Sequence, residues 1–107
     1  MTRRKTPSHS LEAIQKAVAR GHYVVTAKVL ATAARVLCDR EDIAECIAQL
    51  TLDDFYKSMP SKKRPGCWQD VYRTRFGGFR VYVKLDLVQR QTDLVVVLSF
   101  KHDEAAR

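Results

Sequence analysis

The sequence predicts an α+β domain in which three N-terminal helices pack on one face of a C-terminal antiparallel sheet. Apolar residues recur at helical spacing as far as Leu50, and at strand spacing from Cys67 onward. Turn signals at Gly77-Gly78 and at residues 90–93 divide the second half into three strands. The chain of 107 residues has the length of a single domain with one core.

The first helix is bounded by Ser10, which is suited to an N-cap, and by Gly21, which is suited to the C′ position. Its apolar stripe would consist of Leu11, Ile14 and Val18. The next residues, 22–25, are expected to form a short extended link. The many alanines that follow suit close packing of a second helix on a neighbour.

The second and third helices are each preceded by a capping residue, Thr26 and Asp39 respectively. The second helix would bury Val29, Leu30, Ala33 and Leu37. The third would bury Ile43, Cys46, Ile47 and Leu50. Residues 51–54 resemble a capping box, which predicts one further turn carrying Phe55 and Tyr56 and closed by Pro60.

Three strands are expected over residues 67–76, 79–89 and 94–101. A two-residue loop at the first turn would pair Phe76 with Phe79. The same ladder then sets three further pairs, Arg73 with Tyr82, Val71 with Lys84, and Gln69 with Asp86. If Gln89 pairs with Leu94 at the second turn, Tyr82 faces Lys101 and Lys84 faces Ser99.

Period-two alternation gives this sheet one apolar face and one polar face. The apolar face would hold Val83, Leu85, Leu87, Val96, Leu98 and Phe100. The polar face would hold Arg73, Tyr82, Lys84, Ser99 and Lys101. Asp70 falls on the apolar face in this register, so it lies near a strand end, has a polar partner, or marks a bulge.

The charge balance is compatible with a polyanionic partner, although many basic domains bind none. Nineteen Lys and Arg stand against twelve Asp and Glu, for a formal net charge of +7. Residues 1–8 are expected to be a flexible basic arm of the single domain, 1–107. The polar loop 61–66 contains Lys62, Lys63 and Arg64, which either are simply solvated or contact RNA or a protein partner.

The cysteines do not suggest a disulfide framework or a zinc site. Cys38, Cys46 and Cys67 are odd in number and form no CxxC pair, and the histidines lie far from them in sequence. We therefore expect reduced thiols in a cytoplasmic protein, with no metal or cofactor. No apolar run reaches the roughly 20 residues of a membrane span.

Cations beside an aromatic and an amide side chain, without a carboxylate cluster, suit a phosphodiester better than an acyl group. Arg73 could hold two phosphate oxygens in its planar fork. Tyr82 or Lys57 could transfer protons if burial or neighbouring cations lower its pKa. Gln69 could bind a ribose hydroxyl or a base edge. On this pattern alone, an ordinary exposed sheet face is the more frequent interpretation of such residues.

Four blocks of the sequence resemble the MqsR family, the motility and quorum-sensing regulator toxins of bacterial type II toxin–antitoxin pairs. The blocks are residues 55–59 (FYKSM), 68–73 (WQDVYR), 81–84 (VYVK) and 98–101 (LSFK). The resemblance implies a RelE-like α+β fold. It also implies a metal-independent endoribonuclease, an mRNA interferase that cuts messages at short GC-containing sites.

The resemblance also assigns the site. It implies that catalysis is carried by Lys57, Gln69, Arg73 and Tyr82. The resemblance gives Met59 a lesser part. The cations of the 61–66 loop and of the strands are also expected to bind RNA, namely Lys62, Lys63, Arg64, Arg75, Lys84 and Lys101. The chain departs from the family pattern in the 62–66 loop and at Gly77-Gly78, so its cleavage-site preference is left open.

The family's antitoxin is a separate protein with an N-terminal zinc module and a C-terminal helix-turn-helix DNA-binding domain. We therefore expect a cognate MqsA-like antitoxin as a partner beside mRNA, and DNA contact only through that antitoxin. Two alternatives remain, a basic module that binds RNA without cutting it, and a transcriptional co-regulator that acts through a DNA-binding partner.

Overall fold

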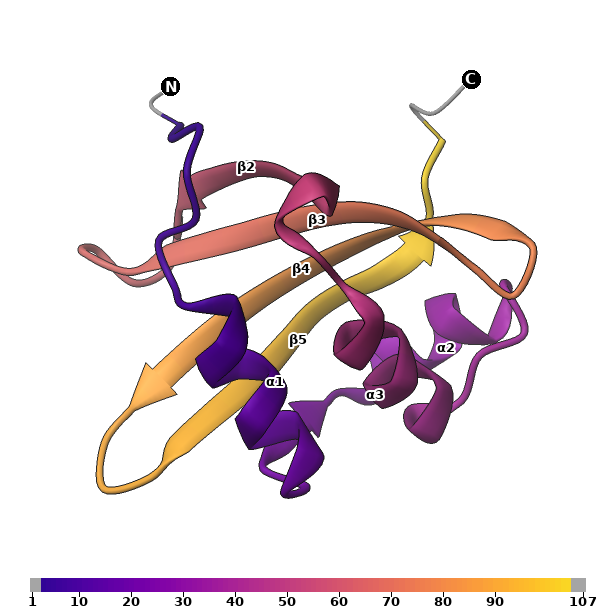
Figure 1. The fold of residues 1–107 in the computed structure, drawn as a ribbon, viewed down its shortest axis with the longest axis horizontal. Helices are drawn as coiled ribbons and strands as arrows, with labels where there is room; N and C mark the ends of the chain where they lie inside the picture. The colour runs from indigo at the N-terminus through magenta and orange to yellow at the C-terminus, as the bar shows by residue number, and fades with distance from the viewer. Residues whose placement is uncertain (1–2, 105–107) are drawn as a thin grey trace.

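In the computed structural model, which describes residues 3–104, three helices cover one face of a five-stranded sheet (Figure 1). The helices are α1 (Leu11–Ala19), α2 (Ala27–Ala34) and α3 (Arg40–Gln49), and a 3-10 turn, η1, spans Leu52–Asp54. The strands are β1 (Tyr23–Val25), β2 (Phe55–Pro60), β3 (Trp68–Phe76), β4 (Phe79–Gln89) and β5 (Asp93–His102). The predicted α+β class is confirmed.

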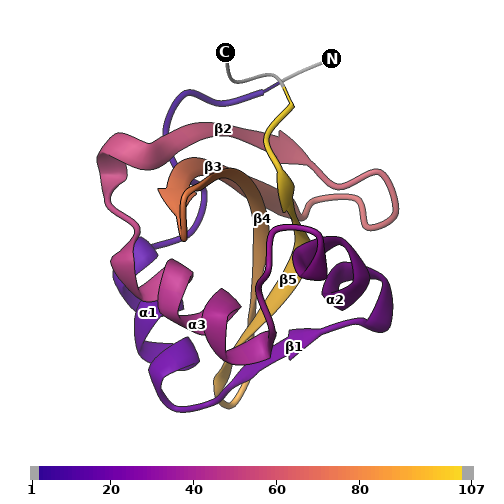
Figure 2. The ribbon, with the colours of Figure 1, turned by 90° about the vertical axis from the view of Figure 1, so that its right-hand side faces the viewer.

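The sheet is larger than the predicted three strands and is mixed rather than wholly antiparallel. Its order is β1-β5-β4-β3-β2. The edge strand β1 runs parallel to β5, while the other neighbours are antiparallel. The sheet curls so that β2 and β3 lie away from the helix layer (Figure 2). One face of β3, β4 and β5 is therefore left without a covering helix.

The three helices begin where their capping residues predict. The side chains of Ser10, Thr26 and Asp39 accept backbone N–H groups at the starts of α1, α2 and α3 respectively. After α1 the chain turns through Gly21, whose φ of +80° lies in the left-handed region that glycine adopts freely. Local side-chain chemistry thus sets the helix boundaries.

The end of the second helix was predicted wrongly. Helix α2 stops at Ala34, and Leu37 adopts a φ of +60° with 80% of its surface exposed. Val36 occupies the buried position instead. The left-handed Leu37 closes the helix end, where the backbone N–H of Cys38 bonds back to the carbonyl of Ala33.

Strand β2 was predicted to be a continuation of a helical turn, and this is also wrong. The capping box exists, since the Thr51 N–H donates to Asp54 Oδ2 at 2.9 Å. The turn nevertheless ends at Asp54, and Phe55 begins a strand that pairs with β3 as far as Pro60. Likewise the extended link at 22–25 contains β1, which the parallel pairing with β5 incorporates into the sheet.

The register of the first hairpin is confirmed at Phe76 with Phe79, Arg73 with Tyr82, and Val71 with Lys84. The ladder begins at Asp70 opposite Leu85, so the expected pair of Gln69 and Asp86 lies outside it.

In the second hairpin, Tyr82 pairs with Lys101 and Lys84 with Ser99 as predicted, but Gln89 pairs with Asp93 rather than Leu94. A bulge between Lys84 and Leu85 accounts for the shift of one residue.

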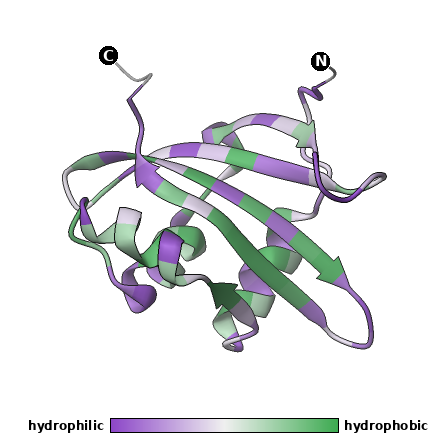
Figure 3. Cartoon of the chain, turned by 180° about the vertical axis from the view of Figure 1, so that it is seen from behind, coloured by the Kyte–Doolittle hydropathy of each residue, from purple (hydrophilic) through white to green (hydrophobic). Residues whose placement is uncertain are grey.

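The bulge changes which valines of β5 enter the core. Val95 and Val97 are fully buried, whereas Val96 and Leu98, which were expected there, are only half-buried. The alternation of hydrophobic and hydrophilic residues along the strands is visible in Figure 3. The core between sheet and helices is centred on Ile14, Ala33, Ile43, Ile47, Tyr72, Val81, Val83, Leu85, Val95, Val97 and Phe100.

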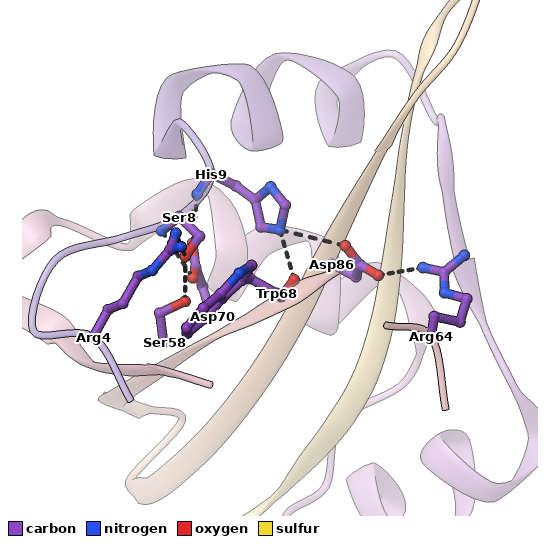
Figure 4. Close-up of polar contacts among 8 residues, drawn as sticks. All are labelled: Arg4, Ser8, His9, Ser58, Arg64, Trp68, Asp70 and Asp86. Atoms are coloured by element: carbon purple, nitrogen blue, oxygen red, sulfur yellow. Dashed lines mark hydrogen bonds and ion pairs between the residues drawn. The ribbon is translucent and has the colours of Figure 1, made fainter. Parts of the chain in front are cut away.

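The unexplained Asp70 has polar partners from the N-terminal segment. Its carboxylate is fully buried and accepts the backbone N–H groups of Ser8 and His9 at 3.0 and 2.9 Å (Figure 4). Arg4 exchanges backbone hydrogen bonds with Ser58, and its guanidinium lies 3.6 Å from the ring centroid of Trp68. The segment expected to be a flexible arm is thus bound to β2 and β3 from Arg4 onward; Met1 and Thr2 lie outside the described residues.

Candidate nucleic-acid interface

The helix-free face of the sheet carries a row of residues across four strands. Lys57 of β2 lies opposite Val71 of β3, which lies opposite Lys84 of β4, which in turn lies opposite Ser99 of β5. Val71 has no exposed surface. Because cross-strand partners project from the same face, the side chains of the two half-buried lysines lie on either side of this valine.

A second row lies beside the first, two residues along each strand. Arg73 of β3 pairs with Tyr82 of β4, which pairs with Lys101 of β5. The ammonium of Lys101 is 5.2 Å from the ring centroid of Tyr82. On the other side of the first row, Met59 of β2 lies opposite Gln69 of β3. The four predicted catalytic residues therefore share one face with Met59, Lys84 and Lys101.

Arg73 is held on two sides. Its Nε donates to Asp103 Oδ2 at 2.6 Å, and this hydrogen bond raises the pKa of the guanidinium further above its already high value. The carbon of the guanidinium lies 4.7 Å from the ring centroid of Tyr56, a residue of the β2 bulge. Lys57 also approaches this ring, at 5.4 Å. Tyr56 and Asp103 together define where the Arg73 head can lie.

Tyr82 and Lys84 have pKa shifts of opposite direction. Burial, with lesser contributions from Tyr56 and Asp103, raises the pKa of the Tyr82 phenol. Burial and the neighbouring Lys101, Lys57 and Lys62 lower the pKa of the Lys84 ammonium. The condition set for proton transfer by Tyr82, a lowered pKa, is therefore not met in the free protein. The lysine whose pKa is lowered is Lys84, which the sequence assigned only to RNA binding.

The remaining predicted RNA-binding residues have different surroundings. Lys62 and Lys63 are exposed in the loop between β2 and β3, and Lys62 is close enough to affect the Lys84 ammonium. Arg75 is exposed opposite Arg80 near the Gly77-Gly78 turn.

Arg64 instead pairs with the buried carboxylate of Asp86, whose other oxygen lies 3.3 Å from His9 Nε2 (Figure 4). Arg64 thereby ties its loop to the sheet.

Two residues of the site were missed in the sequence. Tyr56 belongs to the FYKSM block next to Lys57, and this adjacency was a usable signal once residues 55–60 are placed on a strand. Asp103 follows the last strand and has no motif around it. Its position beside Arg73 results from sheet pairing alone.

A protein-family model described as "Motility quorum-sensing regulator, toxin of MqsA" matches residues 6–102. The chain belongs to the MqsR toxin family. It is 33% identical over 98 residues to the protein named "mRNA interferase toxin MqsR" of Escherichia coli strain K12. The aligned residues cover 92% of this chain and 96% of that protein. The match to the MqsR family includes every candidate residue from Lys57 to Lys101 and ends one residue before Asp103. Among residues 3–104 there is no helix with the length and apolar character needed to cross a bilayer.

Proposed function

We propose that this MqsR-family chain is an mRNA interferase, the toxin of a toxin–antitoxin pair, that inhibits translation and growth by cutting messages at short GC-containing sites in the cytoplasm. Support comes from membership of the family, from the name of the Escherichia coli relative, and from the basic face of the sheet. We further propose that the arrangement of helices and sheet is RelE-like.

The reaction we propose is attack of a ribose 2′-oxygen on the adjacent phosphorus. The 2′-hydroxyl loses its proton, the new bond from O2′ to phosphorus forms, and the bond from phosphorus to O5′ breaks. The departing O5′ takes up a proton, so the products are a 2′,3′-cyclic phosphate and a 5′-hydroxyl. An enzyme supplies a proton acceptor, a proton donor and positive charge on the pentacoordinate phosphate.

Lys84 and Tyr82 suit the two proton transfers. The lowered pKa of Lys84 increases the fraction of free amine that can accept the 2′-hydroxyl proton, with Lys57 across Val71 as the second amine of the row. The raised pKa of Tyr82 keeps its phenol protonated, as a donor to the departing O5′ requires. The two residues lie two positions apart on β4 and therefore on the same face.

Arg73 and Lys101 supply the positive charge. The planar fork of Arg73 can bind two phosphate oxygens, and Lys101 lies at the opposite side of the Tyr82 ring. Gln69 would hold a ribose hydroxyl or a base edge, with Met59 beside it as an apolar contact. Lys62, Lys63, Arg64 and Arg75 would contact the RNA backbone further along, Arg64 through the part of its guanidinium that Asp86 does not cover.

The proposed protein partner is an MqsA-like antitoxin with a zinc module and a helix-turn-helix domain. The family description names the toxin as that of MqsA, which supports a cognate antitoxin for this chain. Zinc and DNA binding would both belong to the antitoxin. The toxin itself would require neither metal nor cofactor for cleavage.

The observation that carries this proposal is the clustering of Lys57, Arg73, Tyr82, Lys84 and Lys101 on one sheet face. Its test is incubation of the purified chain with a defined mRNA in EDTA, followed by mapping of the cut ends. We expect discrete cuts at GC-containing sites with cyclic phosphate ends. Cutting should fall roughly 100-fold or more in Tyr82→Phe and Lys57→Ala. The matched control is Lys28→Ala, which removes an exposed lysine from α2 on the far side of the sheet.

If the RNA is retarded on a gel but never cut, the chain is a binding module and the proposal of an interferase fails. Binding should weaken steeply with salt in either case, because several Lys and Arg displace counterions from the RNA. Affinity that stays constant over a several-fold increase in salt would contradict the assignment of the basic face.

A further inference from the structure

Arg73 is anchored at one edge of its guanidinium and available at the other. The group has five N–H donors, of which the Nε–H is bound to Asp103 Oδ2 at 2.6 Å. Within residues 3–104, no other hydrogen bond from this guanidinium occurs. Tyr56 lies against it at 4.7 Å and limits its rotation. The two terminal amino groups are therefore free to bind a ligand while the Nε edge is fixed.

Asp103 directly follows β5 and is held against the sheet by a backbone hydrogen bond. It is only 3% exposed, and its backbone N–H donates to the carbonyl of Arg80 at 2.9 Å, one residue beyond the last β4–β5 pair. From its place directly after β5, its carboxylate reaches across β4 to Arg73 on β3. A carboxylate buried to this degree requires a cationic or hydrogen-bonding partner, and Arg73 is that partner.

We propose that Asp103 is a positioning residue for RNA cleavage, whose buried carboxylate fixes the Nε edge of Arg73 so that the terminal amino groups face the scissile phosphate. This inference rests on the role proposed above for Arg73. A free arginine side chain samples many rotamers, and holding it in advance removes that entropy from the transition state. Asp103 lies outside the segment that matches the family.

The negative charge of Asp103 also has an unfavourable effect, since it lies close to where the phosphate binds. Removing the charge should strengthen electrostatic attraction of RNA while releasing Arg73 from its catalytic orientation. Affinity and cleavage rate should therefore respond in opposite directions. A residue that only stabilises the fold would lower both together.

The first experiment compares wild type with Asp103→Asn, a substitution that keeps the side-chain shape. Single-turnover cleavage is measured at saturating mRNA, and Kd is measured with the same RNA carrying a 2′-deoxy nucleotide at the mapped cut. We expect the cleavage rate to fall about tenfold or more, while the Kd for RNA stays unchanged or becomes lower. The control is Glu104→Gln, which removes the same charge from the next, exposed residue and should leave the rate unchanged.

The second experiment repeats Asp103→Asn in an Arg73→Lys background, because a lysine cannot form the Nε contact. We expect Arg73→Lys to lower the rate and Asp103→Asn to cause no further loss. If Arg73→Lys cleaves at the wild-type rate, the role proposed for Arg73 fails and the positioning role fails with it. If Arg73→Lys is impaired but Asp103→Asn is not, or if Asp103→Asn lowers the rate equally in both backgrounds, only the positioning role is overturned.

A readout independent of cleavage guards against misfolded variants. The Nε–H proton of Arg73, observed by NMR, should exchange slowly in wild type and in Asp103→Glu, which keeps a charged acceptor. In Asp103→Asn its exchange should be faster. Rapid exchange in the wild-type protein, as in a free arginine, would overturn the inference whatever the variants do.

Discussion

Lys84 lies directly opposite Val71 in the sheet, and this valine has no exposed surface although it lies on the face that the helices do not cover. The ammonium of Lys84 is thus carried on a stem packed over an apolar side chain, among Lys101, Lys57 and Lys62. Such surroundings disfavour the charged form of Lys84. The ammonium therefore destabilises the fold, while its lowered pKa supports the role of proton acceptor proposed for it.

Lys84→Met should stabilise the folded protein and weaken its activity. Methionine keeps an unbranched apolar chain beside Val71. It removes the Lys84 ammonium, whose pKa is lowered by burial and by neighbouring cations. We expect Tm to rise by a few degrees and cleavage to fall about 100-fold. Lys28→Met, at an exposed position on α2, should leave Tm nearly unchanged.

The stability difference should also depend on pH with a defined sign. In the unfolded chain Lys84 holds its proton up to its usual pKa of 10.5, whereas in the folded protein it releases the proton at lower pH. The unfolded state therefore binds more protons between these two pKa values. As pH rises through this window, the free energy of unfolding of the wild type increases relative to that of Lys84→Met, and the Tm difference becomes smaller. A Tm difference that grows with pH would contradict the lowered pKa.

The cleavage rate of wild type should rise with pH and level off below pH 10.5. The rise reflects the increasing fraction of free amine on Lys84, while the raised pKa of Tyr82 keeps the phenol protonated over the same range. Single-turnover rates at saturating RNA measure this directly. In Lys84→Arg the charge remains at all pH values, so the rate should be low and its rise with pH absent.

Tyr72→Phe should leave cleavage unchanged and stabilise the protein by about 1 kcal/mol. Tyr72 belongs to the WQDVYR block, but it faces the core, where its hydroxyl is buried without a hydrogen-bond partner among residues 3–104. Tyr23→Phe is the matched control, because Arg40 donates to the Tyr23 hydroxyl at 2.9 Å. It should destabilise the protein by a similar amount in urea unfolding, and a loss of stability in Tyr72→Phe would show that this hydroxyl has a partner.

Asp70→Ala should release the N-terminal segment from the sheet. The substitution leaves the N–H groups of Ser8 and His9 without their acceptor and removes a fully buried, hydrogen-bonded carboxylate. We expect a loss of about 2–3 kcal/mol in the free energy of unfolding, with faster hydrogen exchange at these two amides.

Asp53→Ala, at an exposed position in η1, provides the comparison for Asp70→Ala. Unchanged exchange at Ser8 and His9 in Asp70→Ala would mean that the segment is held by Arg4 and Ser58 instead.

The helices were predictable because their signals are local. Ser10, Thr26 and Asp39 lie next to the backbone groups that they cap, and apolar residues follow at helical spacing. Strands β1 and β2 lack such signals, since an edge strand is defined by the partner with which it pairs. The capping box at residues 51–54 was real but lasted only one turn.

The site was predictable where its residues belong to one continuous hairpin. The turn at Gly77-Gly78 sets the register, so Arg73, Tyr82 and Lys84 follow from period-two alternation. The bulge at Lys84 and Leu85 has no sequence signature, and it moved the core valines of β5 by one position.

The contact between Arg73 and Asp103 spans three strands. No pattern along the chain could reveal it. The shifted pKa of Lys84 was likewise unpredictable, because it depends on burial in the folded sheet and on lysines from three other segments.

The strand order has a consequence for how the protein is made. The last strand, β5, lies between β1 and β4, so the first strand of the chain has no place in the sheet until the C-terminal residues have been synthesised. Contacts between distant parts of a chain also form slowly. The basic face, to which Lys101 contributes from β5, therefore assembles only after β5 has left the ribosome.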